Sequence, residues 1–111
     1  MKTVRIYSPA RNDIIEWPES ARKELGAILT RLQKGEAIGM PDVRPMPLVS
    51  RGASEIRIKM DKGIYRAFLV IETEFGILVF HSFQKKSQKT PQIEIETGKT
   101  RLRAFLEELR I

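Results

Sequence analysis

Apolar and charged residues alternate from Ser54 to Met60, which is the pattern of a β-strand with one buried face. The residues Asp61–Gly63 have the composition of a tight turn, and the nearly continuous apolar run Ile64–Glu72 after them predicts a central strand. A second turn at 73–76 leads into a third apolar segment, 77–83. These three segments predict an antiparallel meander.

Two helices are expected before the meander and one after it. A strand at Thr3–Tyr7 precedes a short helix that reaches Trp17, and apolar residues three or four apart predict a second helix over Glu19–Lys34. Gly26 lies inside that second helix and suggests that another backbone packs closely there. The last helix is expected from Pro91 to about Arg110, with a stripe of apolar residues facing the core.

Residues 36–53 hold Pro41, Pro45 and Pro47 and follow neither periodicity, so they are expected to form a connecting loop. The order of elements predicts an α+β fold in which an N-terminal strand and two helices pack on an antiparallel sheet with a C-terminal helix. A chain of 111 residues is long enough for one core, so residues 1–111 are expected to form a single domain.

Composition narrows the chemistry. The sequence has no cysteine and one histidine, which excludes disulfides, thiolate nucleophiles and histidine clusters, and its paired glutamates are not spaced for a metal site. It also lacks a glycine-rich phosphate loop and a dinucleotide fingerprint, so no cofactor is expected. A net charge of +6, concentrated after residue 50, favours a polyanionic partner. No membrane span or export signal is recognisable, so a cytoplasmic location is expected.

A lysine-rich segment joins the third meander strand to the last helix. Lys85, Lys86 and Lys89 are followed by Thr90 and Pro91, which are expected to be the N-cap and the first residue of the helix. Ammonium groups and helix amides would then converge at one corner. This is the chemistry of a phosphate site.

The first two meander strands carry a second group of cations. Arg57 and Lys59 share one face of their strand, and Arg66 lies on the neighbouring strand. A cationic binding face and an ordinary solvated sheet face both fit this pattern. Arg66 is different because it lies within an apolar run, where an unpaired charge is very unfavourable, and Glu55 is a candidate partner for it.

His81 is the first candidate for a general base, since its side chain has an ordinary pKa close to neutrality. The competing interpretation is a hydrogen-bonded core histidine, because the residue lies within an apolar strand. Tyr65 is a second proton-handling candidate. Its position next to Arg66 on a strand directs it to the opposite face of the sheet.

The order of elements, together with Glu55-Ile56-Arg57, Tyr65-Arg66 and the segment from His81 to Pro91, resembles the phage-derived branch of the RelE/HigB toxins of bacterial type II toxin–antitoxin systems. The resemblance spans essentially the whole chain. It implies a RelE-like fold and a small ribonuclease, usually one that cuts messenger RNA on the ribosome. In that chemistry a 2′-hydroxyl attacks the adjacent phosphate, and neither a metal nor a cofactor is required.

The resemblance also implies roles for particular residues. In the RelE branch, cations on the meander strands and just after them form the site, and the residues at matching positions here are Arg57, Lys59, Arg66 and Lys86. That branch has a catalytic tyrosine at the start of the last helix, where this chain has Gln92, so His81 or Lys59 would have to transfer the proton. The cations expected to hold the RNA backbone are Arg51, Lys62, Lys85 and Lys89.

The same resemblance implies partners: a helix-turn-helix antitoxin that covers the basic face, and the ribosome with its messenger RNA. Two alternatives stay open. One is a protein similar to ParE, which poisons gyrase, and the other is a phage-derived protein that only binds RNA or its antitoxin.

Overall fold

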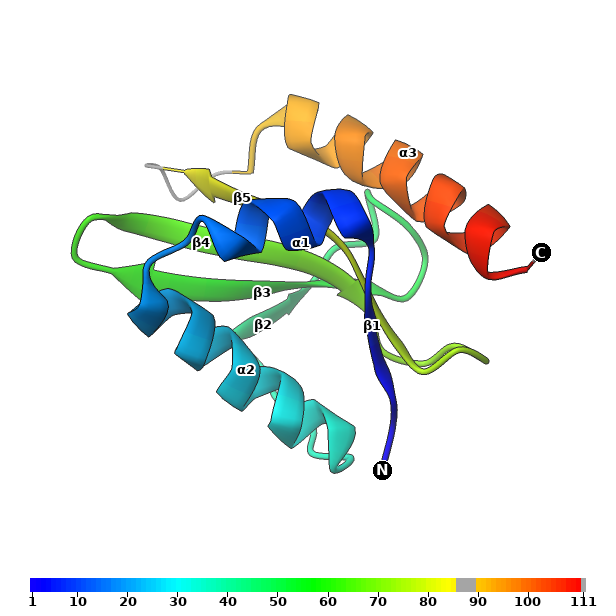
Figure 1. The fold of residues 1–111 in the computed structure, drawn as a ribbon, viewed down its shortest axis with the longest axis horizontal. Coiled ribbons are helices and arrows are strands. Elements are labelled where there is room, and N and C mark those ends of the chain that lie inside the picture. Colours follow the sequence, from blue (N-terminus) through cyan, green and yellow to red (C-terminus); the bar gives the residue numbers. More distant parts are fainter. Residues whose placement is uncertain (86–89, 111) are drawn as a thin grey trace.

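The computed structural model describes residues 1–85 and 90–110, and Figure 1 shows its ribbon. In this part of the chain five strands form one sheet in the order β1-β5-β4-β3-β2. The strands are β1 (Val4–Ile6), β2 (Val43–Pro45), β3 (Ala53–Met60), β4 (Gly63–Val70) and β5 (Ile77–Lys85). The helices are α1 (Ser8–Ile15), α2 (Glu19–Gln33) and α3 (Gln92–Leu109).

The antiparallel meander β3-β4-β5 is confirmed, and β4 lies at the centre of the sheet as its continuous apolar run predicts. The α+β class is confirmed as well. The first strand, β1, is itself part of the sheet and runs parallel to β5, with Val4 opposite Ile77. This parallel pairing is possible because α1 and α2 carry the chain away from β1 before the meander begins.

The prediction of a loop without strands over 36–53 is wrong, because β2 lies within it. Arg44 pairs with Glu55 and Pro45 with Ser54 along the outer side of β3. Proline lacks the amide hydrogen of a full ladder and is therefore confined to edge strands or strand ends. The prolines that hide this strand from pattern analysis are compatible with it because β2 is at the edge.

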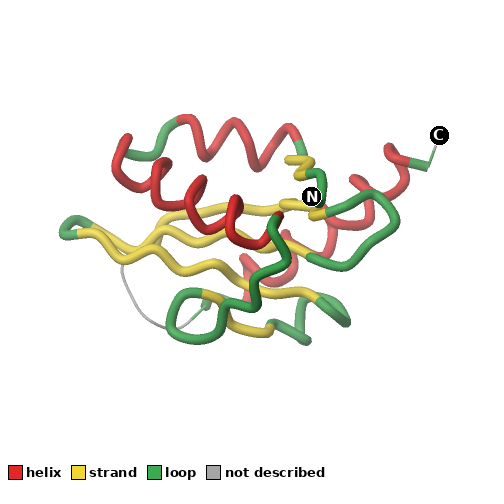
Figure 2. The backbone as a smooth tube through the Cα atoms, turned by 90° about the horizontal axis from the view of Figure 1, so that it is seen from below, coloured by secondary structure: helices red, strands yellow, loops and turns green. Residues whose placement is uncertain are grey.

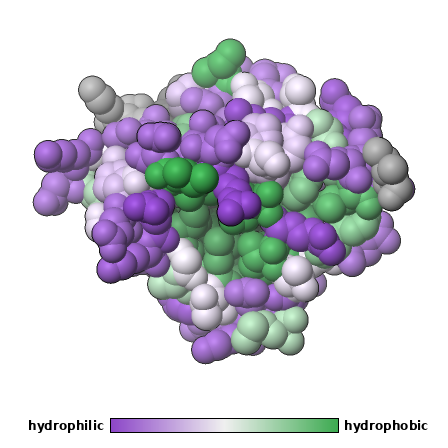
Figure 3. Space-filling view, viewed as in Figure 1, coloured by the Kyte–Doolittle hydropathy of each residue, from purple (hydrophilic) through white to green (hydrophobic). Residues whose placement is uncertain are grey.

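The helices divide between the two faces of the sheet. Seen from below in Figure 2, α1 and α2 cover one face and α3 covers the other. The core under α1 and α2 includes Trp17, Ile58 and Tyr65, and the core under α3 includes Phe68, Phe80 and Phe105. The surface that carries α1 and α2 is mostly hydrophilic, with apolar side chains gathered in its middle (Figure 3).

Close packing occurs at a different helical glycine from the one expected. A Cβ atom built on Gly26 would have no heavy atom of another element within 4 Å, so that expectation is wrong. A Cβ atom on Gly98 would lie 2.8 Å from Cδ2 of Phe68 and 3.1 Å from Cε2. The missing side chain of Gly98 therefore lets α3 approach the ring on β4, and this contact holds α3 against the sheet.

Candidate functional site

The buried carboxylate of Glu55 is the centre of a polar network on the α3 face of the sheet. Glu55 has no exposed surface, and its Oε1 atom lies 3.1 Å from Nη2 of Arg44 and 3.2 Å from Nη1 of Arg66. The Nε atom of Arg57 lies 3.8 Å from the same oxygen. Three adjacent strands thus supply three guanidinium groups to one carboxylate.

Thr90 joins this network from the segment that precedes α3. Its hydroxyl accepts hydrogen bonds from Nη1 of Arg66 at 2.8 Å and from Nη2 of Arg44 at 3.1 Å, and donates one to Oε2 of Glu55 at 3.0 Å. These three bonds use the full capacity of a hydroxyl group. The predicted N-cap is therefore wrong: the N-cap of α3 is Pro91, which makes no side-chain capping bond. Hydrogen bonds to charged groups are stronger than hydrogen bonds between neutral groups. The hydroxyl of Thr90 therefore bonds to the charged side chains of the network and not to a helix amide.

One carboxylate shared by three guanidinium groups leaves an excess of positive charge. Burial lowers the pKa of Arg66, and the Coulombic attraction of Glu55 opposes that lowering. Arg66 is completely buried, so its side chain has no surface from which to touch a ligand, whereas Arg44 and Arg57 are partly exposed. Glu55 is indeed the partner of Arg66, as the sequence suggests.

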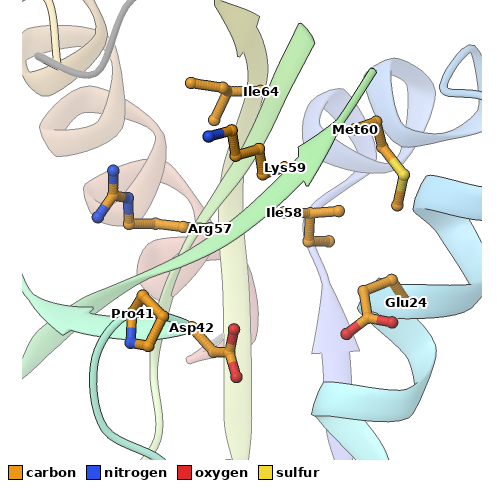
Figure 4. A pocket seen from close by; sticks show the side chains of 8 residues that line it. All are labelled: Glu24, Pro41, Asp42, Arg57, Ile58, Lys59, Met60 and Ile64. Carbon is orange, nitrogen blue, oxygen red and sulfur yellow. The ribbon is translucent and has the colours of Figure 1, made fainter. Parts of the chain in front are cut away.

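Arg57 and Lys59 line a cavity of about 450 Å³ along the edge of β3. Figure 4 shows their side chains on one side of the strand and Ile58 on the other side, facing α2. Near this cavity, the backbone amide of Arg57 donates a hydrogen bond to the carbonyl of Asp42 at 2.8 Å, which holds the residue before β2 against β3. Two of the cations predicted for the site therefore share one cavity.

A second cavity, of about 340 Å³, lies on the other side of the Glu55 network. Arg44 and Thr90 contribute its polar lining, and its apolar lining comes from β2, the following loop and α3: Pro45, Met46, Pro47, Leu48 and Ile95. Sequence reasoning missed Arg44. Arg44 is the one charged residue from Val43 to Val49, which is a clue to it, but only the pairing of β2 with β3 brings it to Glu55.

The structure does not bring His81 into the Arg57 cavity. Neighbouring strands are about 4.8 Å apart and residues rise about 3.3 Å along a strand. The strand register therefore puts the Cα atoms of His81 and Arg57 roughly 12 Å apart. His81 Nε2 lies 2.8 Å from Glu94 Oε1, and Nδ1 lies 3.0 Å from Nη1 of Arg101. A guanidinium only donates, so Nδ1 is the acceptor and Nε2–H the donor. Both ring nitrogens are engaged.

Burial is the main cause that lowers the pKa of His81, so its neutral form is favoured. Arg101 also pairs with Asp13 at 3.3 Å, which links α3 to α1 beside the imidazole. This arrangement corresponds to the hydrogen-bonded core histidine, the second of the two interpretations. His81 and Arg101 themselves line a cavity together with Trp17 and Gln84, and this cavity is separate from the cavities beside Glu55.

The remaining predicted residues lie in different places. Lys62 is exposed in the β3–β4 turn, next to the end of β3 that carries Lys59. Arg51 lies before the other end of β3 and lines a separate cavity with Val70 and Arg110. At about 3.3 Å per residue, the length of β3 puts Arg51 roughly 20 Å from Lys59. The structure thus places Lys62 near the Arg57 cavity and Arg51 far from it.

The lysine-rich segment is described only in part. The backbone of Lys85 closes β5 and pairs with Ile64, which in turn pairs with Lys59. Lys86 and Lys89 lie outside the described residues. Tyr65 is buried on the opposite face of the sheet, where its ring packs against that of Trp17 with centroids 5.1 Å apart, as its alternation with Arg66 predicts.

Two further properties concern residues 1–85 and 90–110. No group of three or more histidine, aspartate or glutamate side chains in these ranges is arranged to hold a metal ion. None of the helices in the same ranges combines the length and apolarity that a membrane crossing demands.

Comparison with known proteins adds a family and a fold. The model of the family described as "Phage derived protein Gp49-like (DUF891)" matches residues 12–103. A solved structure of the E. coli toxin RelE, a double arginine-to-alanine mutant in the free state, is similar with a TM-score of 0.53 and 14% identity. The similarity covers 93% of this chain and 96% of that chain, and at this identity it shows the fold. No curated protein sequence matches significantly.

Proposed function

This chain belongs to the phage-derived Gp49-like family, and on that premise we propose that it is the toxin of a type II toxin–antitoxin system, an endoribonuclease that cuts messenger RNA on the ribosome. The RelE fold supports the proposal because the RelE structure to which it is similar is described as a toxin. The observation that carries it is the excess of guanidinium groups around Glu55, next to a cavity that Arg57 and Lys59 line.

The proposed reaction is an internal phosphoryl transfer. The 2′-oxygen of one nucleotide forms a bond to the adjacent phosphorus, the bond to the 5′-oxygen of the next nucleotide breaks, and a 2′,3′-cyclic phosphate remains. One proton leaves the 2′-hydroxyl and one reaches the departing 5′-oxygen. Arg57 and Lys59 stabilise the negative charge that gathers on the phosphate oxygens in the transition state.

Lys59 is the better of the two candidates for proton transfer in this scheme. His81 has both ring nitrogens engaged and lies outside the cavity, whereas Lys59 is exposed within it. Arg66 contributes through Glu55, by holding the carboxylate that orients Arg57. Lys86 stays a predicted participant in the chemistry.

Contacts between lysine side chains and the RNA backbone complete the proposed interface. Lys62 in the β3–β4 turn and the backbone of Lys85 at the end of β5 lie at the end of the meander that carries Lys59, and both lysines are proposed to hold the RNA backbone. The sequence predicts the same role for Lys89. Such contacts give affinity that falls with salt and carries little sequence preference. Arg51, at the other end of β3, takes no part in this proposal.

The test is brief induction of the protein in growing cells, with the 5′ ends of messenger RNA mapped afterwards. We expect growth arrest together with new 5′ ends inside coding regions. Lys59→Ala should remove these ends, and Lys23→Ala, on the exposed surface of α2, is the matched control that should retain them. Arrested growth with intact messenger RNA would exclude the nuclease.

Ribosome dependence and the antitoxin need separate experiments. Purified protein should cut messenger RNA bound to ribosomes faster than the same RNA free in solution. A helix-turn-helix protein encoded beside this chain should form a stable complex with it and restore growth, because an acidic segment covering Arg57 and Lys59 would neutralise the site. A neighbouring product that neither binds nor restores growth would contradict this pairing.

One observation favours a second candidate, a protein that binds without cutting. Gln92 opens α3 where the RelE branch has its tyrosine, and its amide donates to Glu96 at 2.9 Å. A ParE-like gyrase poison or a protein that binds only RNA or its antitoxin would fit this feature. DNA breaks that depend on gyrase would identify the first, and occupied ribosomes with uncut messenger RNA the second.

A further inference from the structure

The Arg44 cavity has a composition that the cleavage reaction does not explain. One partly exposed guanidinium and one hydroxyl lie among apolar side chains from β2, the loop after it and α3. Leu48, which lines this cavity, is 69% exposed, so part of the apolar lining is open to solvent. A cavity with apolar walls and a single cation is suited to a ligand that has both a flat apolar part and a negative charge.

This cavity is connected to the proposed cleavage site through one carboxylate. Arg44 and Arg57 both lie close to Oε1 of Glu55, at 3.1 and 3.8 Å, so one carboxylate oxygen holds both guanidinium groups near each other. Thr90 also accepts a hydrogen bond from Nη2 of Arg44. A strand of RNA that presents one phosphate to Arg57 therefore has a second cation, with apolar walls beside it, within reach of the neighbouring nucleotide.

The size and the chemistry of the cavity both fit one nucleotide. A space of about 340 Å³ falls within the range of small-molecule sites. Pro47 and Leu48 offer apolar surfaces for the face of a base, and Arg44 can donate to a phosphate or to acceptor atoms on a base edge.

We propose that the Arg44 cavity is a nucleotide subsite: Arg44 binds a phosphate of the RNA strand adjacent to the one that is cut, and the apolar wall around Leu48 receives the attached base. This inference rests on the proposed function and adds a source of sequence preference to it. A base held in this subsite would set which phosphate reaches Arg57.

The test uses a twelve-nucleotide single-stranded RNA with a 2′-O-methyl group on every residue, which the reaction cannot cut. Its affinity for the purified protein is measured by fluorescence anisotropy over a range of salt concentrations. Arg44→Ala should weaken binding and reduce the slope of log affinity against log salt by about 0.7, the value of one phosphate contact on a single strand. Leu48→Ser should weaken binding roughly tenfold, a typical loss for one base contact, with an unchanged salt slope.

Ile15→Ser is the matched control, because Ile15 is also an exposed large apolar residue but lies on α1, across the sheet. It should leave the affinity unchanged. A second probe, a sugar–phosphate oligomer of the same length without bases, should bind the wild-type protein and Leu48→Ser equally. Tm is measured for each variant, so that a loss of folding is distinguished from a loss of contact.

The outcomes separate the subsite from the function on which it rests. Binding by the wild-type protein that Arg44→Ala and Leu48→Ser do not alter would overturn the subsite alone. Failure of the wild-type protein to bind the modified RNA, on and off the ribosome, would overturn both the subsite and the proposed function. Leu48→Ser that retains RNA affinity but loses its protein partner would show a protein interface and overturn the subsite.

Discussion

Two polar networks lie on the α3 side of the sheet, and they differ in how charge is distributed. Around Glu55, one buried carboxylate is shared by the guanidinium groups of Arg44, Arg57 and Arg66. Around His81, the guanidinium of Arg101 contacts the imidazole and the carboxylate of Asp13, and the carboxylate of Glu94 contacts the other ring nitrogen. The first network has positive charge left over at its exposed edge, and the second does not.

This difference indicates that the Glu55 network binds a ligand and that the His81 network holds elements of the fold together. A cluster with surplus cations attracts phosphate, and its buried carboxylate fixes the direction in which the cations point. The His81 cluster holds one guanidinium and two carboxylates and so has no surplus cation, and its hydrogen bonds and ion pair join β5 to α3 and α1. We therefore expect changes near Glu55 to affect folding and activity together, and changes near His81 to affect stability alone.

The largest expected effect is the loss of stability in Arg66→Met. Removing one partner of a buried ion pair leaves the other charge poorly compensated and typically costs about 3–5 kcal/mol. Arg101→Met removes the corresponding cation of the His81 network, which is more exposed, and should cost about 1 kcal/mol or less. Urea unfolding of both variants measures the difference. Equal losses would erase the distinction between the two networks.

The next effect is on the rate of RNA cleavage. Arg57→Ala removes a partly exposed cation from the proposed site and should lower the rate on the order of a hundredfold, as is typical for one transition-state donor. Arg101→Ala, in the His81 network, should retain a rate close to that of the wild-type protein. Initial rates on ribosome-bound messenger RNA check both variants. A loss of cleavage rate in Arg101→Ala at unchanged stability would make His81 a candidate for proton transfer again.

The contrast also explains what could be predicted from the sequence. Alternation and apolar runs predict β3, β4 and β5 because these strands bury whole faces, and they place Arg57 and Lys59 on one side. The pairing of Arg66 with Glu55 could be predicted as well, since a charge inside an apolar run requires a partner close by.

Other features depend on contacts between distant parts of the chain. Arg44 reaches Glu55 only because β2 pairs with β3, and the prolines around Arg44 conceal that strand. Thr90 has the local sequence of an N-cap, but the charged groups on β3 and β4 bind its hydroxyl instead. Likewise, the spacing of His81 and the lysines along the chain does not reveal that Glu94 and Arg101 engage the imidazole.

A smaller effect is expected from the hydroxyl of Thr90. Thr90→Val keeps the shape of the side chain but leaves donors and an acceptor of the Glu55 network without their partner, which typically costs about 1–3 kcal/mol. Thr97→Val makes the same chemical change in the cavity above His81 and should alter stability by about 0.5 kcal/mol or less. Denaturant titration compares them. A greater loss in Thr97→Val would contradict the central role of Thr90.

The smallest effect is a pH dependence confined to the His81 network. Burial lowers the pKa of His81 from its ordinary value of 6.5, Arg101 lowers it further, and the carboxylates of Glu94 and Asp13 oppose the change. In the unfolded chain the imidazole keeps the ordinary pKa, so below about pH 6.5 the unfolded state binds a proton that the folded state does not. Stability should therefore be fully present above that pH and decline as the pH falls toward the lowered pKa.

The free energy of unfolding measured between about pH 7.5 and 5.5 tests this, because ordinary carboxylates stay ionised over most of that range. His81→Gln removes the titrating group and should flatten the curve, while Arg57→Ala should keep the slope of the wild-type protein. If the free energy of unfolding of His81→Gln still fell with pH, the carboxylates and not His81 would cause the pH dependence. The His81 network would then not be the source of the pH dependence.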